Sequence, residues 1–96
     1  MSKEKVLPTQ YHIEVYEGSF RNDPFWAVES STPFPAMSAG EVFFTGGLDA
    51  ALYDKPNDNQ VFKIKELKHM FWMIEGSHIG HKLMVCIELS EKNLKD

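Results

Sequence analysis

The sequence predicts one mainly β (α+β) domain: a small five-stranded barrel or curved antiparallel sheet, with one short helix between strands three and four. Three observations predict it. Residues 10–17 alternate between apolar and polar side chains, two long β-prone runs flank a glycine-bearing loop near the C-terminus, and 43 % of the 96 residues are hydrophobic. A chain of this length is too short for two hydrophobic cores. We therefore expect residues 1–96 to form a single domain with flexible ends at 1–5 and 91–96.

Three strands are predicted in the first half of the chain. Gln10–Glu17 places its apolar residues at odd-numbered positions, which is the pattern of a half-buried strand. Phe25–Ser30 follows a turn-rich stretch as the second strand. Glu41–Thr45 is the third, and two glycines end it. Between the second and third strands, Ser31–Pro35 holds two prolines, so it should be an extended connection and not a central strand.

One short helix is predicted at Leu48–Tyr53. Leu48, Ala51 and Leu52 fall at positions i, i+3 and i+4, which gives one apolar face over two turns at most. Pro56 ends this helix and opens a loop.

The last third of the chain predicts a long hairpin. Val61–Ile74 and Lys82–Leu89 are the two strands, and in the loop between them Gly76 and Gly80 are free to adopt positive φ.

The long run has a break in its register. Phe62 and Ile64 share one face, whereas the later apolar residues Leu67 and Phe71 have the opposite parity. A β-bulge near Lys65–Glu66 would bring both sets inward. A helix over Lys65–Met73 is the alternative, because Leu67, Met70 and Phe71 also match helical spacing. The β-branched and aromatic neighbours favour the strand.

Charge and cysteine content argue against several classes of protein. The net charge is −4 and Arg21 is the sole arginine, so we expect no nucleic-acid partner. No apolar run approaches 18 residues, and no secretory signal precedes Pro8, so we expect no membrane span. A single cysteine, Cys86, cannot form a disulfide within one chain. These features predict a cytoplasmic location.

Histidines are the first candidates for chemistry. His78 and His81 lie three residues apart in the predicted loop, and His69 lies in the strand before it. Two such histidines could bind zinc if His69, Cys86 or Glu75 supplied a third ligand. The competing interpretation has His78 and His81 bonding to backbone groups of the turn. No accompanying zinc motif favours the metal, so we expect no metal and no cofactor.

Catalytic machinery is not predicted. Cys86 lies in an apolar stretch typical of a buried structural cysteine, and no serine nucleophile motif is present. Glu14 could share a face with Glu29 or Glu41 on neighbouring strands, although solvated acids on the outside of a sheet explain the same pattern.

Aromatic residues form three adjacent pairs on predicted strands, at 25–26, 43–44 and 71–72. Neighbours on a strand point to opposite faces, so one residue of each pair should face outward. An outward aromatic residue on a small domain indicates an oligomer interface, a ligand pocket, or cover by a loop.

Ser31–Pro35 and Ile74–Val85 resemble stretches of short bacterial proteins of the kind carried on mobile integron gene cassettes. Those proteins have no assigned activity to transfer. The resemblance implies a small, stand-alone, bacterial and cytosolic protein, for which self-association would be unsurprising.

These features favour a non-enzymatic binding or interaction module that acts as a homo-oligomer, most simply a dimer. The first alternative is a small-molecule pocket protein or a small enzyme that uses the His69, His78 and His81 region; the second is a metal-binding protein. The ligand-binding or interface candidates are Trp26, Phe44, His69, Trp72, Glu75, His78 and His81.

Overall fold

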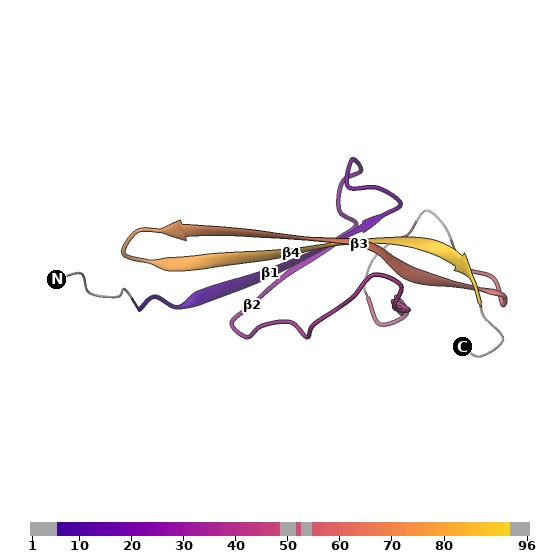
Figure 1. Cartoon of the computed structure of the whole chain (residues 1–96), viewed down its shortest axis with the longest axis horizontal. Helices are drawn as coiled ribbons and strands as arrows, with labels where there is room; N and C mark the ends of the chain where they lie inside the picture. Colours follow the sequence, from indigo (N-terminus) through magenta and orange to yellow (C-terminus); the bar gives the residue numbers. More distant parts are fainter. Residues whose placement is uncertain (1–5, 49–51, 53–54, 93–96) are drawn as a thin grey trace.

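A computed structural model describes residues 6–48, 52 and 55–92, which form one open, four-stranded mixed sheet (Figure 1). The strand order across the sheet is β2-β1-β4-β3. Strands β1 and β4 run parallel, whereas β1–β2 and β3–β4 are antiparallel pairs. The strands are β1 (Thr9–Glu17), β2 (Trp26–Ser30), β3 (Gln60–Ile74) and β4 (His78–Glu91).

The predicted barrel with a helix is wrong. The sheet is open, with β2 and β3 at its edges, and its central pair is parallel. The expected third strand, Glu41–Thr45, is an extended segment with a single bridge from Val42 to Lys63. Of the expected helix Leu48–Tyr53, residues 49–51 and 53 lie outside the described residues, and Leu48 and Leu52 are not helical.

The hairpin and the bulge are confirmed. β3 is a strand throughout, so the helical alternative for Lys65–Met73 is wrong, and its register against β4 shifts by one residue between Ile64 and Glu66. This shift turns Leu67 to the same face as Phe62 and Ile64. One extra residue thus corrects the break in the apolar pattern.

The turn of the hairpin is shorter than predicted. The amide of Ser77 donates to the carbonyl of Ile74 at 3.0 Å, and Gly76 at the third position has a φ of 74°. A positive φ at that position is what a type II turn requires. Gly80 lies inside β4 and does not have a positive φ, so the prediction for that glycine is wrong.

The two faces of the sheet differ in character. One face, which we call the core face, carries the central buried side chains: Ile13, Val15, Phe62, Ile64, Leu83, Val85 and Ile87. The opposite polar face carries His12, Glu14 and Lys82, with Tyr16 and Cys86 buried among them. This division follows from the alternation of side chains along each strand.

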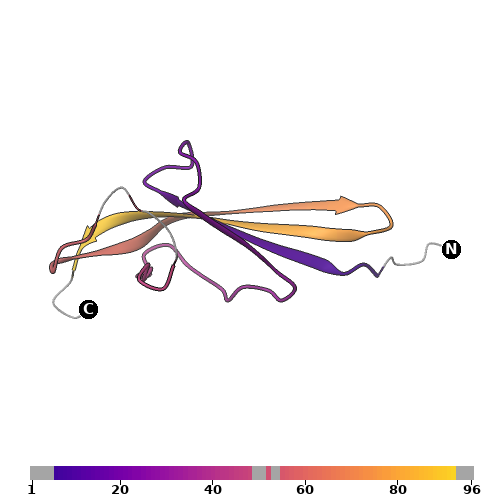
Figure 2. The ribbon, with the colours of Figure 1, turned by 180° about the vertical axis from the view of Figure 1, so that it is seen from behind.

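Two connections cover mainly one half of the sheet. The segment 31–48 lies under the core face, where Phe34, Met37 and Phe43 pack against the core. The loop 18–25 lies on the polar face, where the Phe20 ring meets the Tyr16 ring edge-on at 5.1 Å. Figures 1 and 2 show these two connections on opposite sides of the strands. We call the covered half, which contains the bulge, the base.

Beyond the base, the hairpin extends as an arm, which we define as residues 68–74 of β3 and 78–82 of β4. The molecule measures 59 × 26 × 23 Å, and its radius of gyration is 16.3 Å. A compact domain of this length has a radius of gyration of about 12.5 Å. The elongation follows from the 15 residues of β3, since a strand of that length spans about 50 Å.

Candidate functional site

The core face of the arm carries a cluster of aromatic and histidine rings, made of Tyr11, His69, Phe71 and His81. The register places Tyr11 and Phe71 opposite His81, on either side of it. The Phe71 and His81 rings stack with centroids 4.3 Å apart, and Tyr11 meets His81 edge-on at 6.0 Å. His69 reaches diagonally across, and its Nδ1 lies 2.9 Å from Nε2 of His81. We call this group the histidine cluster.

The short contact between the two histidines requires one nitrogen to carry a hydrogen and the other to accept it. Burial lowers the pKa of His81, and the neighbouring charge of His69 lowers it further. Both effects favour a neutral His81. The neutral His81 ring can then share a single hydrogen bond with His69.

A small cavity of 170 Å³ separates the histidine cluster from the proline-rich connection at Pro33–Met37. Its walls are mostly apolar, with His69, His81 and Tyr11 as polar groups. Pockets for small-molecule ligands usually hold about 300–1,000 Å³. The cavity is thus too small for most metabolites.

On the polar face of the arm, Trp72 lies across Gly80 of the neighbouring strand. A Cβ placed on Gly80 would be 2.0 Å from Cε2 of this indole. The indole also lies against His12 on β1, with ring centroids 5.2 Å apart. Gly80 is therefore needed for close packing of an aromatic ring and not for the turn.

Two carboxylates on the polar face, those of Glu14 and Glu29, lie beside basic side chains. Glu14 accepts a hydrogen bond from the Tyr16 hydroxyl at 2.7 Å, and its Oε1 forms an ion pair with Nζ of Lys82 at 3.3 Å. Glu29 lies 3.5 Å from Nδ1 of His12. Glu14 and Glu29 do share a face, but each carboxylate has its own partner.

Tyr16 is held in its neutral form. Burial raises its pKa to about 12, with the hydrogen bond to Glu14, the charge of Glu14 and that of Asp23 adding to the effect. A phenol with such a pKa is a poor proton donor near neutral pH. The ionic group on this face therefore has the character of a structural network.

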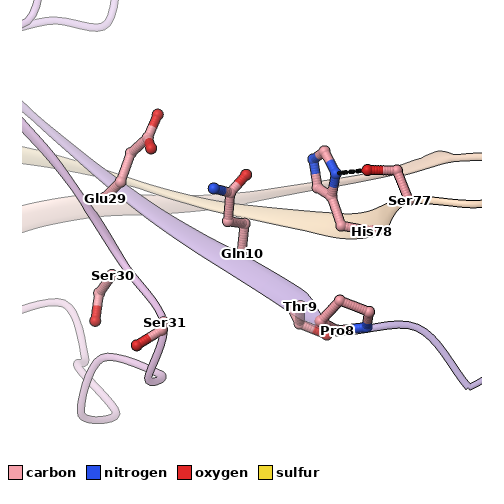
Figure 3. Close-up of a pocket in the computed structure, with 8 residues that line it drawn as sticks. All are labelled: Pro8, Thr9, Gln10, Glu29, Ser30, Ser31, Ser77 and His78. Atoms are coloured by element: carbon pink, nitrogen blue, oxygen red, sulfur yellow. Dashed lines mark hydrogen bonds between the residues drawn. The ribbon is translucent and has the colours of Figure 1, made fainter.

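His78 and His81 do not converge. They are three residues apart on one strand, so they face opposite sides of the sheet, and His78 bonds with the Ser77 hydroxyl at 2.9 Å. His78 lines a hollow of 570 Å³. Figure 3 shows that Gln10 and Glu29 lie on the same side of the sheet as His78, and that Ser30 and Ser31 lie on the other. Among the described residues, no group of three or more His, Cys, Asp or Glu side chains could hold a metal ion.

The other candidate residues lie in separate places. Trp26 is half-buried against the core, Phe44 is 84 % exposed above Gly46, and Glu75 is in the hairpin turn. Cys86 is buried, which raises the pKa of its thiol, and it remains a free cysteine.

The sequence analysis pointed to the aromatic pair at 71–72 but missed the other exposed apolar residues of the arm, Met70, Met73 and Ile74. Met70 and Ile74 are each 49 % exposed on the polar face, and Phe71 and Met73 are exposed at 66 % and 53 % on the core face. The signal was present in the sequence. From residue 70 to 74 every side chain is apolar, so neither face of the strand is polar.

No family model, curated protein or solved structure matches the chain. In the part of the chain that the structure describes, no helix is long and apolar enough to span a membrane.

Proposed function

We propose that this protein is a non-enzymatic interaction module that acts as a homodimer, and that the arm is its interface. The observation that carries the proposal is the exposure of Met70, Phe71, Met73 and Ile74 along one edge strand, on both faces of the sheet. Contiguous apolar surface on a small domain marks an interaction site. An open edge strand adds unpaired backbone groups that another strand can pair with.

The free-energy argument favours an occupied arm. Burying the exposed part of each of these side chains would contribute on the order of 1 kcal/mol. A domain of this size has a total stability of only about 5–15 kcal/mol. Partner contact at the arm would therefore be a substantial share of the stability of the folded chain.

The small-molecule alternative has less support. Of its three histidines, His69 and His81 meet, but His78 faces the other side of the sheet. The cavity beside the pair holds 170 Å³, and the hollow of 570 Å³ beside His78 is lined by neither His69 nor His81. The metal-binding alternative needs a third ligand near His78 and His81, and strand alternation separates these two.

A cytoplasmic location belongs to the same proposal. Its support is the single free cysteine, which is buried with a raised thiol pKa. Such a residue suits a reducing compartment, where no disulfide is needed.

A matched pair of substitutions tests the interface. Phe71→Ser removes a ring that is 66 % exposed on the arm, and Phe44→Ser removes one that is 84 % exposed elsewhere. In analytical ultracentrifugation, the unmodified chain and Phe44→Ser should sediment at twice 11.0 kDa. Phe71→Ser should dissociate into monomers at concentrations at least tenfold higher than those at which the unmodified chain dissociates. Equal dissociation of both variants, or an unmodified chain that sediments as a monomer, would refute the arm as interface.

A further inference from the structure

The backbone of β4 shows which way the backbone groups of β3 point. The amide of Ile79 donates to the carbonyl of Pro8 at 2.9 Å, and that of Gly18 donates to the carbonyl of Ile87 at 2.8 Å. Odd-numbered residues of β4 thus bond toward β1, and even-numbered residues bond toward β3. Beyond the bulge, the register places even-numbered β4 residues opposite even-numbered β3 residues. The N–H and C=O groups of Leu67, His69, Phe71 and Met73 therefore point to the open side of the sheet.

The rest of this edge is covered. The amide of Gly40 donates to the carbonyl of Ile64 at 2.7 Å, and that of Phe43 donates to the carbonyl of Phe62 at 2.8 Å. Within residues 6–48, 52 and 55–92, no backbone hydrogen bond from outside the sheet reaches the four outward-facing residues. We call the stretch Leu67–Met73 the open edge. At one end it stops short of the covering segment 40–43, and at the other end it meets the hairpin turn.

We infer that a second copy of this chain pairs antiparallel with the open edge, about a two-fold axis that passes beside Met70. This inference rests on the proposed homodimer and specifies its geometry. Leu67 lies opposite Met73 of the partner subunit, and His69 lies opposite Phe71 of the partner subunit. All outward groups of the four residues on each strand are then paired, and the two sheets join into one sheet with both β3 strands at its centre.

The register follows from the length of the open edge. Moving the axis to Phe71 places Leu67 opposite the hairpin turn and leaves its backbone groups without a strand partner. Moving it to His69 leaves Met73 opposite the bulge at Lys65 and places two histidines face to face. An axis beside Met70 is the position that uses the whole open edge.

The side chains of the two copies complement one another in this register. Residues directly opposite in an antiparallel pair share a face. The core faces therefore meet through Leu67, His69, Phe71 and Met73, and no like charges lie opposite one another. On the polar face, Met70 meets Met70 of the partner subunit, and Lys68, whose ammonium lies over the Phe20 ring of its own chain at 4.7 Å, lies opposite Trp72 of the partner subunit.

The pairing also closes on itself. A two-fold contact uses each open edge once, so it stops at two copies. The remaining edge is β2, which has five residues and includes Glu29. A short edge strand with a charged side chain resists further strand addition.

Cysteine cross-linking tests the register in the full chain. In Cys86→Ser protein, Met70→Cys places two thiols on opposite positions of a non-hydrogen-bonded pair, where Cβ atoms are about 4.5–5.5 Å apart and close to disulfide range. Mild oxidation should convert more than half of the chains to a covalent dimer. Met73→Cys is the matched control, since its two thiols would be about 20 Å apart along the strand. Circular dichroism checks that each variant is folded.

The outcomes separate the register from the dimer. Cross-linking of Met70→Cys with none in Met73→Cys supports the axis beside Met70. Cross-linking of Phe71→Cys or His69→Cys instead overturns this register while the dimer stands. If no variant cross-links but native mass spectrometry gives twice 11.0 kDa, pairing through the open edge is wrong and the interface lies elsewhere. A mass of 11.0 kDa overturns both proposals.

Discussion

The base and the arm belong to one hairpin but have opposite surroundings. In the base, the loop 18–25 and the segment 31–48 cover the two faces, and Val15, Val85 and Ile87 are 0 % exposed. In the arm, the loop 18–25 reaches the polar face at Lys68, whose ammonium lies over the Phe20 ring at 4.7 Å, whereas Met70 and Ile74 farther along stand half-exposed. The connections of this chain cover mainly one half of the sheet, and in the arm the segment Pro33–Met37 faces the histidine cluster across a small cavity. We propose that a second chain covers the apolar residues of the other half.

The largest difference between the two halves should appear on truncating an isoleucine in each. Ile87→Ala removes a fully buried side chain, so it should lower the free energy of unfolding by about 2–5 kcal/mol. Ile74→Ala removes one that is 49 % exposed in the single chain and should lower it by about 1 kcal/mol. Urea unfolding at one fixed protein concentration measures both. Similar losses for the two variants would contradict the division into a packed base and a bare arm.

A smaller effect should follow from crowding Trp72 on the polar face of the arm. Gly80→Ala places a methyl group 2.0 Å from the indole, so the ring must move at a cost of about 1–3 kcal/mol. Gly47→Ala meets nothing within 4 Å and should change stability by less than about 0.5 kcal/mol. Thermal unfolding measures both. Adding Trp72→Leu to Gly80→Ala should recover most of the loss, and a double variant no better than Gly80→Ala would show that the indole is not the cause.

The smallest effect is a pH dependence from the histidine cluster. The pKa of His81 is lowered from 6.5 in the folded chain, so the unfolded chain binds more protons below that pH. The contribution of His81 to the free energy of unfolding is thus complete above about pH 6.5, and it declines as the pH falls toward the pKa of His81 in the folded chain. The urea concentration at the midpoint of unfolding should be higher at about pH 7.5 than at about pH 5.5, and His81→Gln should reduce this difference. An unchanged difference would exclude His81 as the source.

Local patterns in the sequence predicted the local structure. The alternation in β1, the β-prone runs of the hairpin and the parity break near Lys65 each depend on neighbouring residues, and each is confirmed. The open sheet and the parallel pairing of β1 with β4 were not predicted. Both depend on contacts between residues about 70 positions apart, such as Tyr11 with His81, for which a single sequence carries no pairing signal.

The candidate site shows the same limit. His69 and His81 were named as candidates, and the register brings their rings together. His78 and His81 were predicted to lie together in a loop. Because β4 begins at His78, both residues lie on one strand, and a spacing of three places their side chains on opposite faces of the sheet. The open edge could not be predicted, because it depends on which strand pairs with β4 and on where the segment 40–43 ends.

Amide hydrogen exchange of the unmodified chain, resolved by residue with NMR, tests the central claim most directly. Even-numbered amides of the arm strand, at Lys68, Met70 and Trp72, bond to β4 whether or not a partner is present. If the open edge is an interface, the amides of Leu67, His69, Phe71 and Met73 should be protected as strongly as these neighbours. Protection that alternates along the strand, with only the even-numbered amides slow to exchange, would contradict the account.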